Sequence, residues 1–293
     1  MTKTLIILAG GASSRMKKST TTELSEEAMS QANNRSKSLI LMNDRPMMDY
    51  ILYNAKLAGI TEVILVIGPQ GDLFKTYYGS KTSGNDFHGL TISYAIQHIP
   101  LDRVKPLGTA DAVFQALEQY PELQKTTFLV CNSDNLYSPK VMFALRESTH
   151  PNALISYDRG QLKYPMERIA RFAVLKTTSE RYVEGIVEKP EVGDMAIYKD
   201  SEGHFRVSMN IFKFDGSSFF KHLKNCEIHP VRLEKELPTV IRTLIAEDSK
   251  AIRAIPFGEH VPDLTGKNDI TAMNEYLSKH YASLDWTQKP EFL

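Results

Sequence analysis

A glycine-containing turn near the start of the chain offers the first candidate chemistry. An apolar run ends in Leu8-Ala9-Gly10-Gly11, and Arg15 follows shortly after. Glycines let backbone N–H groups approach phosphate oxygens closely, and an arginine adds planar, permanently charged donors. The spacing matches neither G-x-G-x-x-G nor G-x-x-x-x-G-K-S/T, so the usual dinucleotide and P-loop fingerprints are absent. We interpret the segment as a phosphate-binding turn; a tight turn with a surface arginine is the alternative.

A carboxylate after another apolar segment is the second candidate. The run Phe128 to Cys131 is followed by Asn132-Ser133-Asp134-Asn135. A hard Mg²⁺ ion needs oxygen ligands and usually keeps several waters beside substrate phosphates. Asp134 is therefore the predicted primary metal ligand, and an Asx-type turn is the alternative.

Alternating strands and helices are expected to position these groups. Continuous apolar runs predict strands covered on both faces. Pro46 begins a helical pattern that ends at Gly59, and a second helix is expected to begin at Thr109, whose hydroxyl could cap it. We therefore predict an α/β fold with a Rossmann-like, doubly wound, mostly parallel sheet. The strands expected in this half are Thr4 to Ala9, Val63 to Ile67, Thr91 to Ile96 and Phe128 to Cys131.

The second half is richer in predicted strands. Helices are expected at Leu233 to Ala246 and Ile270 to Leu284, and polar composition predicts loops at Lys18 to Arg35 and Gly79 to Gly89. We expect one domain over residues 1–293, in which residues 18–36 form an inserted loop or lid. The strands expected here are Ala153 to Tyr157, Phe172 to Leu175, Tyr182 to Val187, Val207 to Phe214 and Ala251 to Phe257.

The glycine turn and the residues after it resemble the signature of sugar-phosphate nucleotidyltransferases. Leu-Ala-Gly-Gly is followed by Arg15, and Lys37 precedes a leucine-rich strand and a Pro-Met helix start. The resemblance implies catalytic roles for Arg15 and Lys37. In that family the lysine follows closely after the arginine, whereas Lys37 lies beyond the inserted loop, so Lys17 and Lys18 are alternatives.

Two further segments resemble the nucleoside-binding part of this family. Gly108 and Thr109 belong to a Gly-Thr-Ala turn that lies against the nucleoside in the family, where a helix start offers unpaired N–H donors. Gln97 resembles the glutamine that pairs with a pyrimidine edge, since an amide carries both a donor and an acceptor. The alternatives are a turn that needs its glycine and a glutamine at a surface strand end.

The resemblance extends to the metal and sugar sides. Asp263 corresponds to the second metal ligand, while the nearby Asp269 could be a helix cap. Glu188 and Lys189 precede Pro190 in a Glu-Lys-Pro element that implies contacts with the sugar hydroxyls and its phosphate. Asn210 is expected within a strand, on the face opposite its neighbours, as a sugar contact. The alternative for Glu188 and Lys189 is a charged strand end before a turn. The alternative for Asn210 is an edge amide whose hydrogen bonds are satisfied within the protein.

The implied activity is the Mg²⁺-dependent transfer of a nucleoside monophosphate from a nucleoside triphosphate, with UTP or dTTP favoured, to a sugar 1-phosphate. Alternatives are another phosphorylated acceptor of the choline phosphate or molybdopterin type, a metal-dependent glycosyltransferase, and a nucleotide-sensing domain without turnover.

Composition limits the partners that we expect. The chain has 35 basic and 35 acidic residues, which argues against a dedicated nucleic-acid binder. No apolar run is long enough to span a membrane, so a cytoplasmic location is expected. We assign neither cysteine to catalysis, metal binding or a disulfide, and the oligomeric state cannot be predicted.

Overall fold

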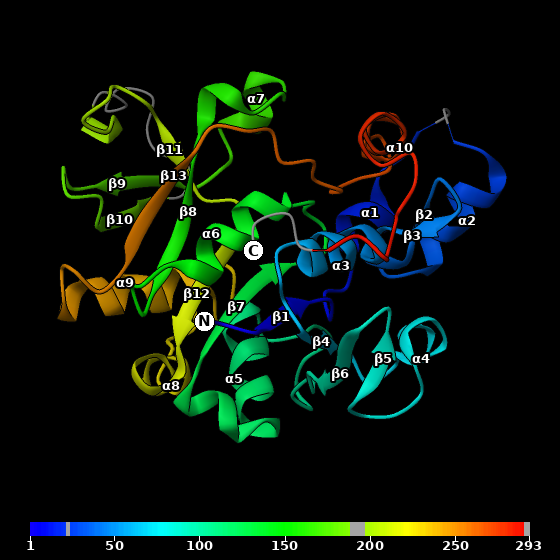
Figure 1. The fold of residues 1–293 in the computed structure, drawn as a ribbon, viewed down its shortest axis with the longest axis horizontal. Helices are drawn as coiled ribbons and strands as arrows, with labels where there is room; N and C mark the ends of the chain where they lie inside the picture. The colour runs from blue at the N-terminus through cyan, green and yellow to red at the C-terminus, as the bar shows by residue number, and fades with distance from the viewer. Residues whose placement is uncertain (22–23, 188–196, 290–293) are drawn as a thin grey trace. The chain divides into compact units, whose positions relative to one another are not determined.

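The computed structural model describes residues 1–21, 24–187 and 197–289, and its chain forms two compact units (Figure 1). The first unit contains residues 1–2, 107–131 and 144–261. The second contains residues 3–106, 132–143 and 262–293. The single domain expected over residues 1–293 stays a prediction.

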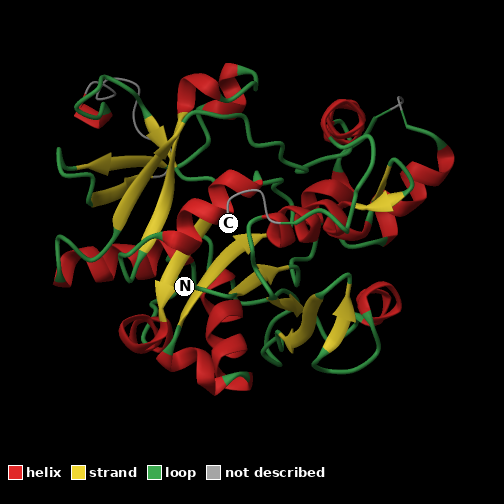
Figure 2. Ribbon diagram, in the orientation of Figure 1, coloured by secondary structure: helices red, strands yellow, loops and turns green. Residues whose placement is uncertain are grey.

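The second unit has a parallel sheet with one antiparallel edge strand (Figure 2). Strand β4 (Glu62–Ile67) pairs in parallel with both β1 (Thr4–Leu8) and β6 (Leu90–Ile96), and β5 (Asn85–Phe87) runs antiparallel to β6. Leu5, Ile6 and Ile7 are fully buried, as expected for a strand covered on both faces. The unit also contains the hairpin β2 (Leu41–Met42) and β3 (Arg45–Pro46), the 3₁₀ turn η1 (Lys37–Leu39), and helices α1 (Ser14–Lys18), α2 (Glu26–Asn34), α3 (Met47–Leu57), α4 (Asp72–Tyr78) and α10 (Asp269–His280).

Two segments expected to be loops contain regular structure. Residues 18–35 include helix α2, so the expectation of a loop was wrong there. The Ser25 side chain accepts the Ala28 N–H and caps this helix, and Gln31 and Ala32 form its buried side. The helix was not predicted because its composition is polar and only these two residues are buried. Residues 79–89 likewise include β5.

The first unit is built on an antiparallel sheet, in the order β10-β9-β11-β8-β12-β7, with β13 parallel to β8. Helices α5, α8 and α9 pack together, and α8 packs against β12. The strands are β7 (Thr127–Asn132), β8 (Ala153–Asp158), β9 (Val174–Thr177), β10 (Val183–Val187), β11 (Arg206–Val207), β12 (Ile211–Asp215) and β13 (Arg253–Phe257). The helices are α5 (Thr109–Gln119), η2 (Pro121–Lys125), α6 (Pro139–Glu147, with residues in both units), η3 (Arg159–Gln161), α7 (Met166–Ile169), α8 (Gly216–Lys224) and α9 (Leu237–Glu247).

The fold class predicted from the sequence is confirmed. Parallel strands alternate with helices in the second unit, and the strand-rich first unit follows mainly from the second half of the chain. One predicted strand, Val207 to Phe214, is interrupted and forms β11 and β12. The interruption includes Asn210, whose φ of 59° is left-handed and incompatible with a continuous strand.

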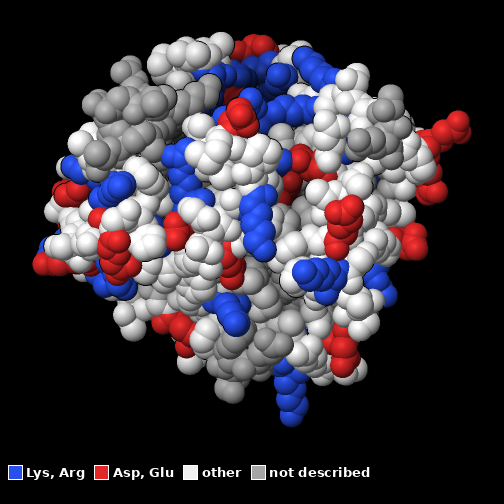
Figure 3. Space-filling view, turned by 90° about the horizontal axis from the view of Figure 1, so that it is seen from above, with Lys and Arg blue, Asp and Glu red and all other residues white. Residues whose placement is uncertain are grey.

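The described surface carries charges of both signs. Figure 3 shows Lys and Arg side chains gathered near the upper edge of one face, with Asp and Glu side chains spread over the same face. None of the helices in the described ranges has the length and apolar character needed to cross a bilayer.

We predict that Gly216→Ala destabilises the first unit. A Cβ at Gly216, the first residue of α8, would overlap the Leu123 carbonyl oxygen, and backbone cannot move aside cheaply. The free energy of unfolding should fall by about 1–3 kcal/mol, measured by urea denaturation. Gly185→Ala is the matched control, because nothing lies within 4 Å of a Cβ there. Equal effects of the two substitutions would refute this packing constraint.

A second prediction concerns acid stability. Burial, together with the charges of Lys163 and Arg168, lowers the pKa of His260 from 6.5 to about 4. The His260 Nδ1 accepts the Lys163 N–H at 3.2 Å, which requires an unprotonated Nδ1. Between these two pKa values the unfolded chain binds more protons, so stability is full above the upper value and falls as pH drops toward the lower one.

The variant His260→Gln should reduce this acid-dependent loss of stability. Urea midpoints measured at about pH 7 and about pH 4.5 would show the difference between the two proteins. Identical losses in wild type and variant would contradict the assignment.

Candidate active site

An ion pair joins the predicted catalytic lysine to the predicted metal ligand. The Lys37 ammonium donates to the Asp134 carboxylate, and their side chains are 15% and 20% exposed. The Lys37 backbone N–H also donates to the Ser13 Oγ at 3.2 Å, a contact that sequence reasoning missed. Lys17 and Lys18 are both exposed. The structure therefore brings Lys37, despite the insertion before it, to the carboxylate that the sequence singled out.

Backbone pairing brings the two predicted metal ligands onto neighbouring segments. Asn135 and Asp263 form an antiparallel bridge, and the Leu264 N–H donates to the Asp134 carbonyl oxygen at 2.8 Å. The Thr265 hydroxyl donates to the Asp263 carboxylate at 2.8 Å. The carboxylates of Asp134 and Asp263 thus belong to one small paired element within the second unit.

Asp269 is the first residue of α10 and not the cap residue that the sequence suggested. Its carboxylate accepts the backbone N–H groups of Thr265 and Gly266 at 2.9 and 2.7 Å. Both residues precede α10, which Asp269 begins. Asp269 therefore holds the turn that carries Thr265, and through that turn it supports Asp263.

The two predicted metal ligands have the donor chemistry that suits a magnesium ion. Mg²⁺ takes oxygen ligands, commonly one or two protein carboxylates together with waters and substrate phosphates. Asp134 and Asp263 supply such a donor set. Within the described ranges, no group of three or more His, Cys, Asp or Glu side chains is placed to hold a metal.

The glycine turn lies against the predicted base-recognition residue. A Cβ added at Gly10 would lie 3.1 Å from the Gln97 Oε1, whereas one at Gly11 would meet nothing within 4 Å. Gln97 is only 3% exposed, so the alternative of a surface strand end is wrong. Leu8 and Ala9 lead into this turn, and the Ala9 N–H donates to the Val66 carbonyl oxygen.

Arg15 is exposed on α1, the helix that follows the glycine turn. Ser13 precedes this helix in a left-handed conformation, with a φ of 53°. In the described ranges, the Arg15 guanidinium has no ion pair within the chain. Its five N–H donors suit a phosphate group.

The Gly-Thr-Ala turn is held by a segment that the sequence did not indicate. Gly108 has a φ of 123°, and a Cβ there would overlap the backbone of Lys235. The Lys235 carbonyl oxygen accepts the Ala110 N–H at 3.0 Å, so this helix-start donor is already paired. Thr109 does not cap its own helix; its Oγ1 accepts the N–H of Leu237 in α9 at 3.1 Å. Packing thus explains Gly108. The helix begins at Thr109 as predicted, but the expected Thr109 cap and the expectation that the Ala110 N–H is unpaired were wrong.

Asn210, predicted as a strand residue that contacts sugar, lies instead in the break between β11 and β12. Its backbone N–H donates to the Ser208 Oγ at 3.3 Å. The left-handed conformation turns this amide out of the regular strand pattern, and such backbone outliers are concentrated at functional sites. Glu188 and Lys189 lie outside the described residues.

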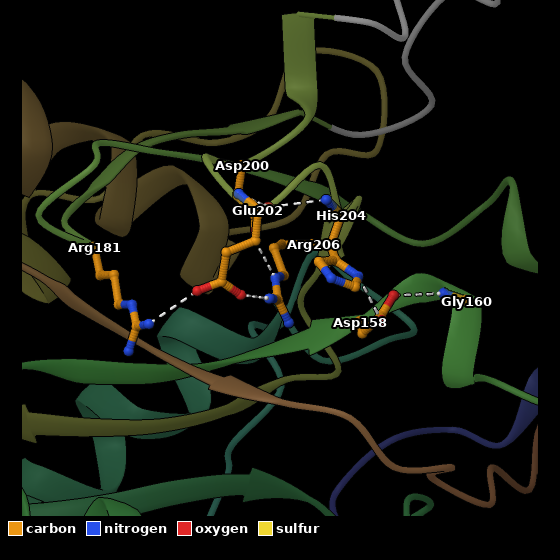
Figure 4. Close-up of polar contacts among 7 residues, drawn as sticks. All are labelled: Asp158, Gly160, Arg181, Asp200, Glu202, His204 and Arg206. Atoms are coloured by element: carbon orange, nitrogen blue, oxygen red, sulfur yellow. Dashed lines mark hydrogen bonds and ion pairs between the residues drawn. The ribbon is translucent and has the colours of Figure 1, made fainter.

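A polar network fixes the strand that leads to Asn210 (Figure 4). The buried Arg206 guanidinium donates to Asp200 at 2.6 Å and to Glu202 at 3.3 Å, and Arg181 also pairs with Glu202. Despite the opposing effect of burial, hydrogen bonds led by that from Arg206 lower the pKa of Asp200. The network therefore anchors β11.

Comparisons with known proteins identify the family of this chain. The model of the nucleotidyl transferase family matches residues 4–280. The bifunctional protein GlmU of Staphylococcus haemolyticus (strain JCSC1435) is 26% identical over 254 residues, which cover 86% of this chain and 47% of that protein. A D-glycero-α-D-manno-heptose 1-phosphate guanylyltransferase of Aneurinibacillus thermoaerophilus is 26% identical over 178 residues, or 61% of this chain and 64% of that protein.

A solved structure has the same fold. A UDP-glucose pyrophosphorylase complexed with UDP-glucose has a TM-score of 0.69 at 15% identity, over 96% of this chain and 100% of that one. The chain spans about half the length of the GlmU relatives, 47% and 52% in two cases. Because the family match covers most of the sequence, this chain belongs to the nucleotidyl transferase family.

Proposed function

We propose that this protein transfers a nucleoside monophosphate from a nucleoside triphosphate to a sugar 1-phosphate and releases pyrophosphate. The observation that carries the proposal is the joining of Lys37, Asp134 and Asp263 in one hydrogen-bonded element. Such a combination of a cation and two oxygen donors suits the transfer of a phosphoryl group between anions.

The reaction needs positive charge and alignment more than a general base. A phosphomonoester carries roughly −1.5 to −2 charge near neutral pH, so its oxygen is already nucleophilic. That oxygen forms a bond to the α-phosphorus while the bond from the α-phosphorus to the bridging oxygen breaks, and pyrophosphate leaves with the electron pair. Lys37 stabilises charge on the α-phosphoryl group, and Arg15 stabilises the departing pyrophosphate.

Asp134 and Asp263 are the proposed ligands of Mg²⁺. The ion, when bound, neutralises phosphate charge and aligns the triphosphate. The Asp134 carboxylate also accepts a hydrogen bond from Lys37, so a single side chain aims the lysine and supplies a metal ligand. The hydroxyl of Thr265 fixes the orientation of the second carboxylate.

Gln97 supports UTP or dTTP as the donor. Its amide lies beside Gly10, directly after β6, and an amide carries the donor and the acceptor that a pyrimidine edge requires. The name of the related pyrophosphorylase, which was solved with UDP-glucose, agrees with a uridine nucleotide. Because another relative is a heptose 1-phosphate guanylyltransferase, GTP should be compared with UTP and dTTP as the donor.

A sugar 1-phosphate is the acceptor that the family resemblance favours. Asn210 supports this assignment through its left-handed turn after β11, and the proposed contacts of Glu188 and Lys189 rest on the resemblance. Another phosphorylated acceptor remains the competing possibility.

The proposal predicts pyrophosphate release from one nucleoside triphosphate with one class of sugar 1-phosphate, and none from Asp134→Asn. The substitution removes the charge of a metal ligand while it keeps the size of the side chain. A panel of four nucleoside triphosphates and several phosphorylated acceptors with Mg²⁺ would measure this. Pyrophosphate release only with choline phosphate or a pterin phosphate would show that the acceptor is that compound and not a sugar 1-phosphate. Full activity of Asp134→Asn would refute the assignment of Asp134 as a metal ligand.

Lys37→Met should lower kcat by about 10²–10³-fold and change KM much less, because its charge is needed most in the transition state. Methionine preserves the aliphatic stem but removes the ammonium. Lys18→Met is the control, since Lys18 is an exposed neighbour of the same type. A change in KM alone would make Lys37 a binding residue, and a larger effect at Lys18 would transfer the role to that residue.

A further inference from the structure

Lys267 is a buried cation outside the set that carries the proposed chemistry. It is 4% exposed, and its ammonium donates to the carbonyl oxygens of Ser19 at 2.6 Å and Lys17 at 3.3 Å. Within the described ranges it has no acidic partner. These two carbonyls lie at the end of α1, where cations favourably bind the unpaired acceptors of a helix.

The backbone of Lys267 reaches the same helix end. Its N–H donates to the Ser19 Oγ at 3.0 Å, and that hydroxyl donates to the Met16 carbonyl oxygen at 3.0 Å. The Ser19 N–H in turn donates to the Arg15 carbonyl oxygen. One residue therefore holds the last turn of α1 through its side chain and its backbone.

Helix α1 depends on such contacts for its orientation. It has five residues, far below the length of about 12–15 at which an isolated helix becomes even marginally stable. Arg15 is exposed on this helix, so packing of its own side chain does not fix its direction. The guanidinium can reach a fixed point only if the helix itself is fixed.

Lys267 also belongs to the segment that carries Asp263. Between them, Thr265 donates to Asp263, and the N–H groups of Thr265 and Gly266 bind Asp269. At the other end of α1, Ser13 accepts the Lys37 N–H. The two ends of this short helix are thus attached to the two segments that carry Asp263 and Lys37, all within the second unit (Figure 1).

We propose that Lys267 is a positioning residue that holds α1 against the Asp263 segment, so that Arg15 and the metal-binding carboxylates act on the same polyphosphate. The inference rests on the proposed function. Lys267 does not touch the nucleotide, because its ammonium is buried against protein carbonyls. It acts through Arg15.

The test is a double-mutant cycle. In an otherwise wild-type protein, Lys267→Met should lower kcat for pyrophosphate release by about 10- to 100-fold. This is the range typical of residues that orient the groups in direct contact with substrate or metal. In an Arg15→Gln background the same substitution should have little further effect, because the residue through which it acts is already lost. Lys279→Met, an exposed lysine in α10, is the matched control and should leave kcat unchanged. If the double variant shows the product of the two single fold-reductions in kcat, the two residues act independently and the proposal is wrong.

A second variant tests the proposal if Lys267→Met does not fold. Ser19→Ala keeps Lys267 but removes the hydroxyl that accepts its N–H. It should reduce kcat in the same direction, by less, and again only while Arg15 is present. If Ser19→Ala and a folded Lys267→Met both keep wild-type kcat, the proposal is wrong.

Limited trypsin digestion separates this proposal from the proposed function. Arg15, Lys17 and Lys18 offer cleavage sites within α1, and release of the helix end should speed cleavage there in Lys267→Met but not in Lys279→Met. This readout needs no substrate. Faster cleavage without any pyrophosphate release by wild type would refute the proposed reaction and keep the helix-holding role, whereas unchanged cleavage in a folded variant would refute that role.

Discussion

The antiparallel bridge between Asn135 and Asp263 is the contact on which the candidate site depends. It places Asp134 and Asp263 on neighbouring segments, although much of the chain lies between them. Backbone hydrogen bonds fix this pairing: the Leu136 N–H donates to the Pro262 carbonyl oxygen and the Leu264 N–H to the Asp134 carbonyl oxygen. A phosphoryl transfer between anions requires positive charge at the site. Lys37 supplies part of it within the chain, and a divalent cation would supply the rest.

The inserted segment contributes directly to the position of that lysine. Helix α2 presents Gln31, whose Oε1 accepts the Leu41 N–H at 2.8 Å, and Arg35 donates to the Leu39 carbonyl oxygen. Both contacts lie on the stretch that begins with Lys37. A capped helix with a buried side is therefore part of the frame around the lysine. This explains how Lys37 can reach Asp134 even though the insertion separates it from Arg15.

Continuous apolar runs predicted β1, β4 and β7 because strands buried on both faces need little besides hydrophobic side chains. Polar segments were harder: α2 depends on one serine cap and a few buried residues, so its composition resembled that of a loop. The ion pair between Lys37 and Asp134 joins two residues that the sequence singled out, and their roles stay predictions. Contacts were not predicted where partners are distant in sequence, because nothing near Gly108 or Thr109 indicates Lys235 or Leu237.

The two cations that we propose to act in catalysis are held in opposite ways, and this difference suits the proposed reaction. Lys37 is largely buried and paired, so its ammonium occupies one place before any charge moves. Arg15 extends from a short helix whose ends are tied to other segments, which leaves the guanidinium exposed but the helix fixed. During the transfer, charge grows on the departing pyrophosphate, which must also leave. A fixed cation at the α-phosphorus and a solvent-facing one at the leaving group meet these two demands, because preorganisation favours bond exchange while exposure weakens the hold on the product.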